Sequence, residues 1–269
     1  MADRGLALGD VAALDLDAAR ERTDPLADAA VAGYFATLEH DDPAALFGAL
    51  VRHVAVPPED QVPAIREYLD TASRLPDWVD ADAVARGQAF FNRLVAHHFS
   101  ALYLSSLPGC YAAAKGVQVL RLTGRLQTDA ERRLNETGQF LMDIAGPGAL
   151  TEGGIGVDRV LHVRLMHAAV RWLIEHDPSI ERVDDSAPPA VEQQRPMWSA
   201  SWGRPVNQED LVGTWLTFTS VVYDAFDASG VSYDASDVDD HLHMWHLVAH
   251  LIGAEPALVP SDRATAEAL

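Results

Sequence analysis

Apolar residues recur along most of this chain every three or four positions, which is the spacing of one face of an α-helix. Runs that alternate apolar and polar residues between hairpin turns, the usual pattern of half-buried strands, are almost absent. The pattern therefore predicts an all-α fold. The clearest helical segment covers residues 80–104, with apolar side chains at Ala83, Phe90, Leu94, Val95, Phe99 and Leu102.

Capping and turn residues indicate where the predicted helices begin and end. A Pro-Gly pair at 108–109 follows the helix predicted over 80–104 and is expected to end it. Thr128 and Glu131 have the spacing of a capping box, and they open a helix that is expected to run to Gly146. Further helices are predicted over residues 158–176, 208–226 and 238–252.

The chain is expected to form a single helical domain over residues 24–269. The first 23 residues are small, acidic and alanine-rich, and they are predicted to form a tail or a peripheral arm. Residues 177–205 form one long irregular segment with five prolines, and amphipathic helices flank it on both sides. Irregular segments of this length usually serve as lids, binding loops or linkers. We expect a lid, with Trp198 and Trp202 either lining its inner face or packing in the core.

Charge and composition exclude several classes of partner. Asp and Glu outnumber Lys and Arg by 40 to 20, and the formal net charge of −20 repels nucleic acids and anionic lipid surfaces. The sequence contains neither an apolar run of about 18 residues nor an apolar signal segment near its first residue. We therefore expect a cytoplasmic protein with no membrane span and no nucleic-acid partner. The single cysteine, Cys110, excludes an internal disulfide.

A histidine flanked by arginines is the first candidate for chemistry. Arg164, His167 and Arg171 lie at positions i, i+3 and i+7 of a predicted helix, so they share one face. The two positive charges disfavour protonation of the imidazole, which keeps a nitrogen lone pair available to a metal such as haem iron. The two arginines are then candidates to bind the haem propionates. The same spacing also suits a histidine that packs in the core or lies at the surface.

The preceding predicted helix carries a second candidate pair. Arg133 and Thr137 lie one turn apart on a stripe that also holds Phe140, Leu141 and Ile144. Because burying an unpaired arginine costs several kcal/mol, a guanidinium on an apolar stripe requires an anionic or strongly polar partner. A propionate, another carboxylate or dioxygen fits that requirement. Alternatively, Arg133 extends along the edge of the helix into water.

Histidines near the C-terminus form an alternative metal site. His243, His246 and His250 share one helical face at positions i, i+3 and i+7. The chain contains neither the Glu-x-x-His motif of carboxylate-bridged di-iron bundles nor the His-Glu-x-x-His motif of zinc proteases. A non-haem metal on this helix is therefore the rival hypothesis.

Six short segments of the sequence match those of a known oxygenase family in the same order. They are Leu-Pro-Asp-Trp-Val-Asp at 75–80, Arg-Gly-Gln at 86–88, Thr-Gly-Arg-Leu at 123–126, Arg133 with Thr137, Val-Arg-Leu-Met-His-Ala-Ala-Val-Arg at 163–171, and Trp-Gly-Arg-Pro-Val-Asn-Gln-Glu-Asp-Leu at 202–211. The sequence thus closely resembles the family that includes the latex-clearing proteins and the mycophenolic acid biosynthesis oxygenase. The resemblance extends from about Leu75 to Leu251, and the run at 163–171 is its most specific part.

The resemblance implies an all-helical, globin-like core that binds a b-type haem. The family's proximal histidine ligand corresponds to His167, and its distal arginine and threonine correspond to Arg133 and Thr137. Family members of known activity use dioxygen to cleave carbon–carbon double bonds of isoprenoid chains and leave carbonyl products. The latex-clearing branch also uses a distal glutamate as a base, and the nearest counterparts here are Gln118, whose amide cannot take up a proton, and Glu136.

We therefore predict a haem b-dependent oxygenase or oxidase that acts with dioxygen on a small hydrophobic substrate, such as an isoprenoid or another alkene. His167 is predicted to ligate the iron, and Arg164 and Arg171 to bind the propionates. Arg133 and Thr137 are predicted to donate hydrogen bonds to the reacting oxygen. An electron donor is a further partner to test for. Two alternatives stay open: a haem-binding sensor or carrier without turnover, and a helical enzyme that uses a non-haem metal.

Overall fold

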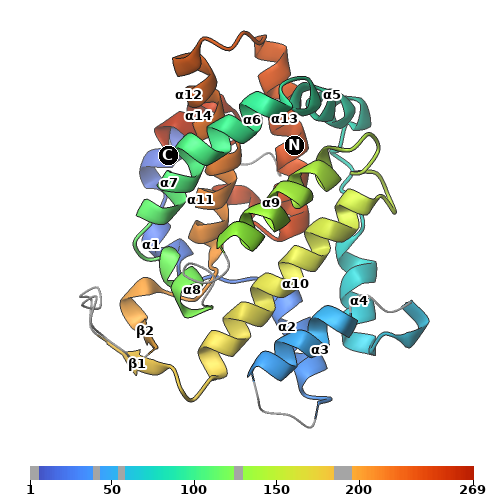
Figure 1. Cartoon of the computed structure of the whole chain (residues 1–269), viewed down its shortest axis with the longest axis vertical. Helices are drawn as coiled ribbons and strands as arrows, with labels where there is room; N and C mark the ends of the chain where they lie inside the picture. Colours follow the sequence, from blue (N-terminus) through green and yellow to red (C-terminus); the bar gives the residue numbers. More distant parts are fainter. Residues whose placement is uncertain (1–5, 39–42, 54–57, 124–129, 185–195) are drawn as a thin grey trace.

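The computed structural model describes residues 6–38, 43–53, 58–123, 130–184 and 196–269, and it is predominantly helical (Figure 1). The all-α prediction is confirmed, because these residues include only two short strands, which pair in parallel. The α-helices span Leu16–Ala19 (α1), Pro25–Phe35 (α2), Pro43–His53 (α3), Pro63–Ala72 (α4), Ala81–Arg93 (α5), Val95–Ala101 (α6), Leu107–Ala112 (α7), Val117–Leu122 (α8), Ala130–Ala145 (α9), Ile155–His176 (α10), Gln208–Phe218 (α11), Ser220–Ser229 (α12), Ala235–Ile252 (α13) and Arg263–Ala268 (α14). The other elements are the strands Glu181–Val183 (β1) and Met197–Ser199 (β2), the 3-10 helices Leu8–Ala13 (η1), Pro58–Asp60 (η2), Ala200–Trp202 (η4) and Pro256–Leu258 (η5), and the π-helical turn Leu102–Ser106 (η3).

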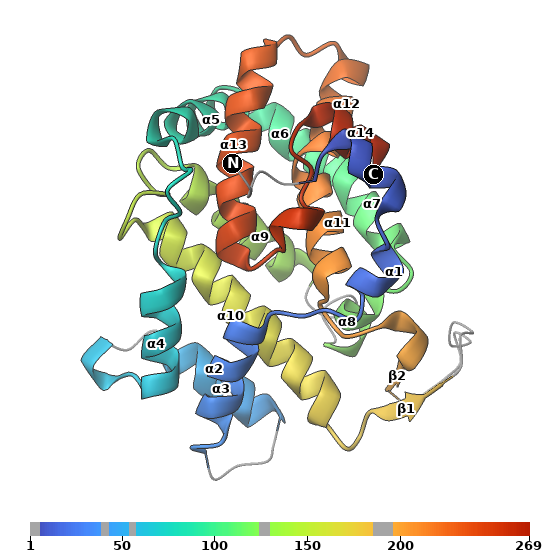
Figure 2. The ribbon, with the colours of Figure 1, turned by 180° about the vertical axis from the view of Figure 1, so that it is seen from behind.

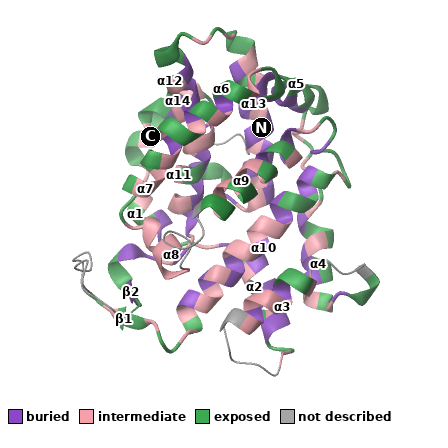
Figure 3. Cartoon of the chain, in the orientation of Figure 1, coloured by how far each residue is buried: buried purple, intermediate pink, exposed green. Residues whose placement is uncertain are grey.

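Helix α10 runs diagonally across the molecule (Figure 1). It contacts helices from the N-terminal and the C-terminal parts of the chain. It packs against α2, α9 and α13, and α13 packs in turn along α5. Val160, Leu165 and Ala169 of α10 have no exposed surface. Figure 3 shows the buried positions along α10 and α13. Because core side chains are close-packed, residues on α10 are positioned by helices from several parts of the chain.

The helix predicted over 80–104 is interrupted in the structure. Between α5 and α6, Leu94 has φ −111° and ψ 24°, which lies outside the helical range. The interruption allows α5 to pack along α13 while α6 packs against α12. Pro108 does not end a helix as predicted. It lies in α7, which continues directly from the π-helical turn η3, so the helix runs on through this position.

The helix predicted over 208–226 is likewise divided, because Thr219 adopts φ −122° and ψ −89° between α11 and α12. Its hydroxyl donates to the Trp215 carbonyl at 2.9 Å, which satisfies a carbonyl near the end of α11. The helices predicted over 158–176 and 238–252 are present, and each begins three residues earlier than predicted. The predicted capping residue Thr128 lies outside the described residues.

The N-terminal segment from residue 6 lies as an arm beside the C-terminal part of the chain (Figure 2). The Leu6 N–H donates to the Val259 carbonyl at 2.6 Å, and the Leu6 carbonyl accepts from the Ser261 N–H at 2.8 Å. Helix η1 packs against α14. These contacts attach the arm to the helical body, and the proposed domain boundary at residue 24 stays a prediction.

Both tryptophans of the predicted lid are buried. Trp198 and Trp202 pack edge to face with their ring centroids 5.4 Å apart. They belong to a small second core cluster that also includes Val119 and Ile174. Of the two arrangements expected from the sequence, the structure shows core packing. Residues 185–195, the centre of the predicted lid, lie outside the described residues.

Length and apolar character together identify a helix that crosses a bilayer. Within the described ranges, no helix is both long enough and apolar enough to span a membrane. The cytoplasmic location and the globin-like character of the core stay predictions.

Candidate functional site

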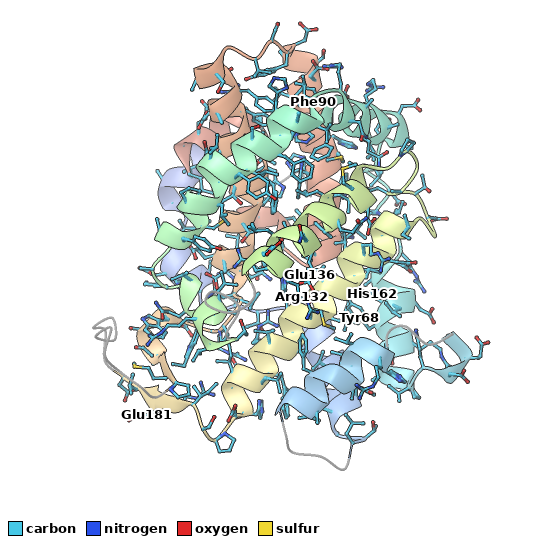
Figure 4. All side chains as sticks on the ribbon, viewed as in Figure 1. Tyr68, Phe90, Arg132, Glu136, His162 and Glu181 are labelled. Carbon is cyan, nitrogen blue, oxygen red and sulfur yellow. The ribbon has the colours of Figure 1, made fainter. Side chains whose placement is uncertain are left out.

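Helix α9 has an exposed face and a half-buried face. On the exposed face, Arg132 and Glu136 form an ion pair one turn apart, with Nε 2.8 Å from Oε1 (Figure 4). On the adjoining face, Arg133 and Thr137 are half-buried, and Leu141 further along is fully buried. This face lies toward the core, where α9 packs against α10.

The Arg133 guanidinium has an unsatisfied donor. Its Nη1 atom is buried, and no described residue accepts a hydrogen bond from it. Its Cζ atom lies 5.4 Å from the ring centroid of Tyr111 on α7, a cation–π contact. The side chain as a whole is half-buried, so the alternative in which it extends along the helix edge into water stays a prediction. Because a buried donor without an acceptor costs about 1–3 kcal/mol, the Nη1 atom indicates a polar partner beyond the described residues.

His167 lies on α10, the helix that packs against α9. Its side chain is half-buried, and its Nδ1 atom is buried. The next two residues, Ala168 and Ala169, are at most 1% exposed. The predicted ligand therefore lies in the core-forming part of α10, on an immediate neighbour of the helix that carries Arg133 and Thr137.

Arg164 is paired with a carboxylate of the protein itself. Its Nε and Nη2 atoms donate to the two oxygens of Asp24, just before α2, at 2.5 and 2.8 Å. Its Nη1 atom donates to the Leu251 carbonyl at 3.2 Å. Although burial opposes it, the hydrogen bond and charge of Asp24 raise the pKa of Arg164. A glycine at position 253 leaves room for the pair, because a β-carbon on Gly253 would lie 2.6 Å from both Arg164 Nε and Asp24 Oδ2.

Arg171 is engaged in the same way and is only 2% exposed. It forms an ion pair with Asp28 of α2 and donates to the backbone carbonyls of Pro205 and Val206 at 2.9 and 2.6 Å. Burial raises the pKa of Asp28, and the charge of Arg171 acts in the opposite direction. The two arginines thus join α10 to α2 on either side of His167. Their role as propionate partners stays a prediction.

The two positions considered for a distal base are engaged locally. Gln118 on α8 donates from its side-chain amide to the Ala114 carbonyl at 2.9 Å. Glu136 accepts a hydrogen bond from Arg132 on the exposed face of α9. Among the described side chains, no carboxylate accepts from the buried Nη1 atom of Arg133. Neither position therefore gains support as a base from its contacts.

The C-terminal histidines make structural contacts. The Nε2 atom of His243 accepts the backbone N–H of Asp80 at 2.9 Å, and that of His246 lies 2.7 Å from a backbone carbonyl of the C-terminal segment. His250 packs edge to face against Trp78. The described part of the chain contains no group of three or more His, Cys, Asp or Glu side chains placed to bind a metal. The contacts therefore do not support the rival hypothesis.

Two histidines that the sequence analysis did not single out are more deeply buried. His98 on α6 is 1% exposed and His241 on α13 is 0% exposed, with ring centroids 5.2 Å apart. His98 Nδ1 lies 3.2 Å from the Leu94 carbonyl and therefore carries the proton, so its buried Nε2 is an acceptor with no donor among the described residues. His241 bonds Tyr223 and Trp245 at 2.8 and 3.2 Å. Burial lowers the pKa of His98 to about 4, and burial also lowers the pKa of His241 well below its usual value.

This burial predicts that the folded protein is sensitive to acid. His98 takes up a proton near pH 6.5 in the unfolded chain but near pH 4 in the folded protein, so stability is full above pH 6.5 and falls as the pH drops toward 4. We expect His98→Phe, which keeps an aromatic ring, to remove about 2 kcal/mol of the stability loss between pH 7 and pH 4.5. Urea unfolding at both pH values measures the loss.

The exposed neighbour His97 provides the control. His97→Phe is expected to keep the pH dependence of the parent protein. If His98→Phe loses as much stability in acid as the parent, the assignment of this sensitivity to His98 is wrong.

Three comparisons relate the chain to known proteins. Residues 86–269 match the sequence model of a protein family. That family is described as ER-bound oxygenase mpaB/B'/Rubber oxygenase, catalytic domain. The rubber oxygenase of Streptomyces sp. (strain K30) is 25% identical over 213 residues, which cover 76% of this chain and 46% of that protein. The solved structure of latex clearing protein LCP in the closed state matches with a TM-score of 0.68 and 23% identity, over 95% of this chain and 64% of that one.

These matches differ in what they establish. The chain spans less than half the length of the rubber oxygenase, and at 23% identity the structural match establishes the fold alone. The family model covers more than half of the chain, including Arg133, Thr137 and His167. The chain therefore belongs to the family of ER-bound mpaB/B' oxygenases and rubber oxygenases, over their catalytic domain.

Proposed function

We propose that this protein is a haem b-dependent oxygenase that uses dioxygen to oxidise a hydrophobic, isoprenoid-like substrate. Family membership supports the oxygenase class, and the rubber and latex in the names of two relatives support the substrate class. The observation that carries the proposal is the buried donor of Arg133, which has no acceptor in the described residues. It lies on the helix that packs against the helix of His167.

The side chains of α9 and α10 fit a haem chemically. An imidazole nitrogen is a common axial ligand of haem iron, and His167 occupies a half-buried position beside buried apolar residues. On the neighbouring helix, a guanidinium and a hydroxyl are one turn apart and leave a buried donor without an acceptor. When bound, the haem would supply the binding and activation of dioxygen that side chains lack.

The protein's own residues would hold and polarise the reactants. Arg133 and Thr137 would donate hydrogen bonds to an oxygen atom as it gains negative charge, and donors that water cannot reach are most effective in that role. We further propose that the main role of Arg164 and Arg171 is to attach α10 to Asp24 and Asp28, with which they already form ion pairs. Held from both sides, α10 would keep the His167 ring in place.

Two measurements test the function. Absorption spectra of the freshly purified protein, oxidised and dithionite-reduced, are expected to show the bands of an axially ligated haem. A colourless protein that takes up no added hemin would contradict the proposal. With haem present, squalene and short cis-polyisoprenes are expected to give carbonyl products under air and none under argon, with and without an added reductant to test for an electron donor. A haem protein that forms no product would instead be a sensor or carrier.

Removing the distal donor is expected to impair turnover and spare haem binding. For Arg133→Ala we expect near-normal haem content and a fall in turnover of about 100-fold, because a donor to the developing charge is lost. Arg132→Ala on the exposed face of α9 is the matched control and should keep both properties. Normal turnover of Arg133→Ala would remove the distal role from this residue.

A further inference from the structure

The contact between Arg133 and Tyr111 brings together two helices, α9 and α7. The Arg133 Cζ atom lies 5.4 Å from the centroid of the half-buried Tyr111 ring. No described residue forms an ion pair with Arg133, and its Nη1 atom is buried. Among the described residues, the aromatic ring is therefore the group that holds this guanidinium.

A guanidinium can be held in two different ways. Carboxylates and carbonyls bind its N–H edge, whereas an aromatic ring binds its flat face. The N–H groups of Arg164 and Arg171 donate to Asp24, Asp28 and backbone carbonyls, so these donors are already engaged. The Cζ atom of Arg133 lies over the Tyr111 ring, and its buried Nη1 donor has no acceptor among the described residues.

The π-helical turn η3 sets the position of the Tyr111 ring. A π-helical turn contains an extra residue, which rotates the residues that follow by about 100° relative to a continuous α-helix. The last residue of the turn and the segment after it are anchored to the end of α11. Ser106 Oγ donates to the Thr217 carbonyl at 2.6 Å, and Cys110 Sγ lies 3.7 Å from Thr217 Oγ1. Tyr111 follows Cys110 directly and contacts α9.

We infer that Tyr111 is a positioning residue that holds Arg133 by its guanidinium face and keeps the N–H edge free for an anionic or electron-rich ligand. Without the ring, the guanidinium can rotate toward acceptors elsewhere and lose its orientation. The effect on a ligand at the haem rests on the proposed function, whereas the contact of Tyr111 with Arg133 does not. Two measurements therefore test the two parts separately.

The first measurement uses the protein as purified and needs no ligand. In a ¹⁵N–¹H spectrum of arginine Nε–H groups, the signal lost in Arg133→Lys identifies Arg133. We expect ring current from Tyr111 to displace this signal, Tyr111→Phe to preserve the displacement, and Tyr111→Leu to abolish it. Tyr103→Leu is the control, because Tyr103 on η3 is 45% exposed. If Tyr111→Leu leaves the Arg133 signal unmoved, the inference is overturned.

The second measurement is fluoride binding by the haem-loaded protein, because fluoride accepts hydrogen bonds and reports on nearby donors. We expect Tyr111→Leu to weaken fluoride binding by about tenfold at unchanged haem content, and Tyr111→Phe to stay within about threefold of the parent. Arg133→Ala should weaken binding at least as much as Tyr111→Leu. Parental affinity in Tyr111→Leu would overturn the ligand-orienting role.

The outcomes separate this inference from the proposed function. A protein that binds no haem contradicts the proposed function, and the arginine spectrum still decides whether Tyr111 holds Arg133. A protein that binds haem with an unmoved Arg133 signal keeps the proposed function and overturns the inference. If Tyr111→Phe keeps the displaced Arg133 signal and Tyr111→Leu does not, an aromatic ring is required and side-chain packing alone is not enough.

Discussion

Protein purified as His167→Ala is expected to lack the haem absorption bands of the parent. An axial imidazole is the main covalent link between a b-type haem and its protein, so its loss should weaken haem retention by about tenfold or more. The half-buried position of His167 in the core-forming part of α10 supports this expectation. Haem per protein chain, measured from the absorption of a pyridine extract, gives the result.

His162 provides a matched control on the same helix. His162, labelled in Figure 4, is also half-buried, but it lies five residues earlier. At about 100° per residue, this places it about 140° around α10 from His167. His162→Ala is expected to retain its haem. In His167→Gly, added imidazole should restore the bands by occupying the vacated position. A full haem complement in His167→Ala would show that another residue ligates the iron.

Replacing Arg171 by methionine is expected to cause a large loss of stability. Its side chain is 2% exposed, forms an ion pair with Asp28 and donates hydrogen bonds to two backbone carbonyls. Methionine fills part of the same space but leaves these acceptors without a donor. Two backbone carbonyls lose their donor, while Asp28 is 28% exposed and keeps access to water. We therefore expect a loss of about 3 kcal/mol, which for a chain of this size lowers Tm by about 5–10 °C. Thermal unfolding followed by circular dichroism measures the shift.

The backbone beside this pair makes the loss larger. Val206 has a φ of +50°, a strained conformation for a β-branched residue, and its carbonyl accepts from Arg171 at 2.6 Å. The bond helps to hold the strained residue in place. Arg159→Met is the control, because Arg159 on the same helix is 50% exposed and its ion pair with Asp143 contributes at most about 1 kcal/mol. Equal effects of the two substitutions would contradict the tethering role of Arg171.

Local pattern predicted the helices well where a helix continues without a break. The segments 158–176 and 238–252 are such helices, and their observed ends at His176 and Ile252 match the prediction. The pattern failed at Leu94 and Thr219, because residues on both sides of each break continue the helical spacing. The break at Leu94 coincides with a change of packing partner, from α13 to α12, and such a change leaves no mark on local periodicity.

The candidate site shows the same division between local and distant information. The spacing placed Arg133 and Thr137 on one face, and the structure leaves an Arg133 donor buried without an acceptor. The sequence did not reveal Tyr111, because its contact with Arg133 depends on the π-helical turn and on the contact of α7 with α11. No spacing within a single helix reveals a contact between two helices.

The sequence by itself determined the all-α class, the position of most helices, the family, and which residues share a helical face with His167. The tertiary structure alone decided what those residues touch. Arg164 pairs with Asp24 and Arg171 with Asp28, across separations of 140 and 143 residues. The physical reason is that helix periodicity is a local property, whereas an arginine among 40 acidic residues acquires its partner only when packing brings one carboxylate within reach and removes water from the pair.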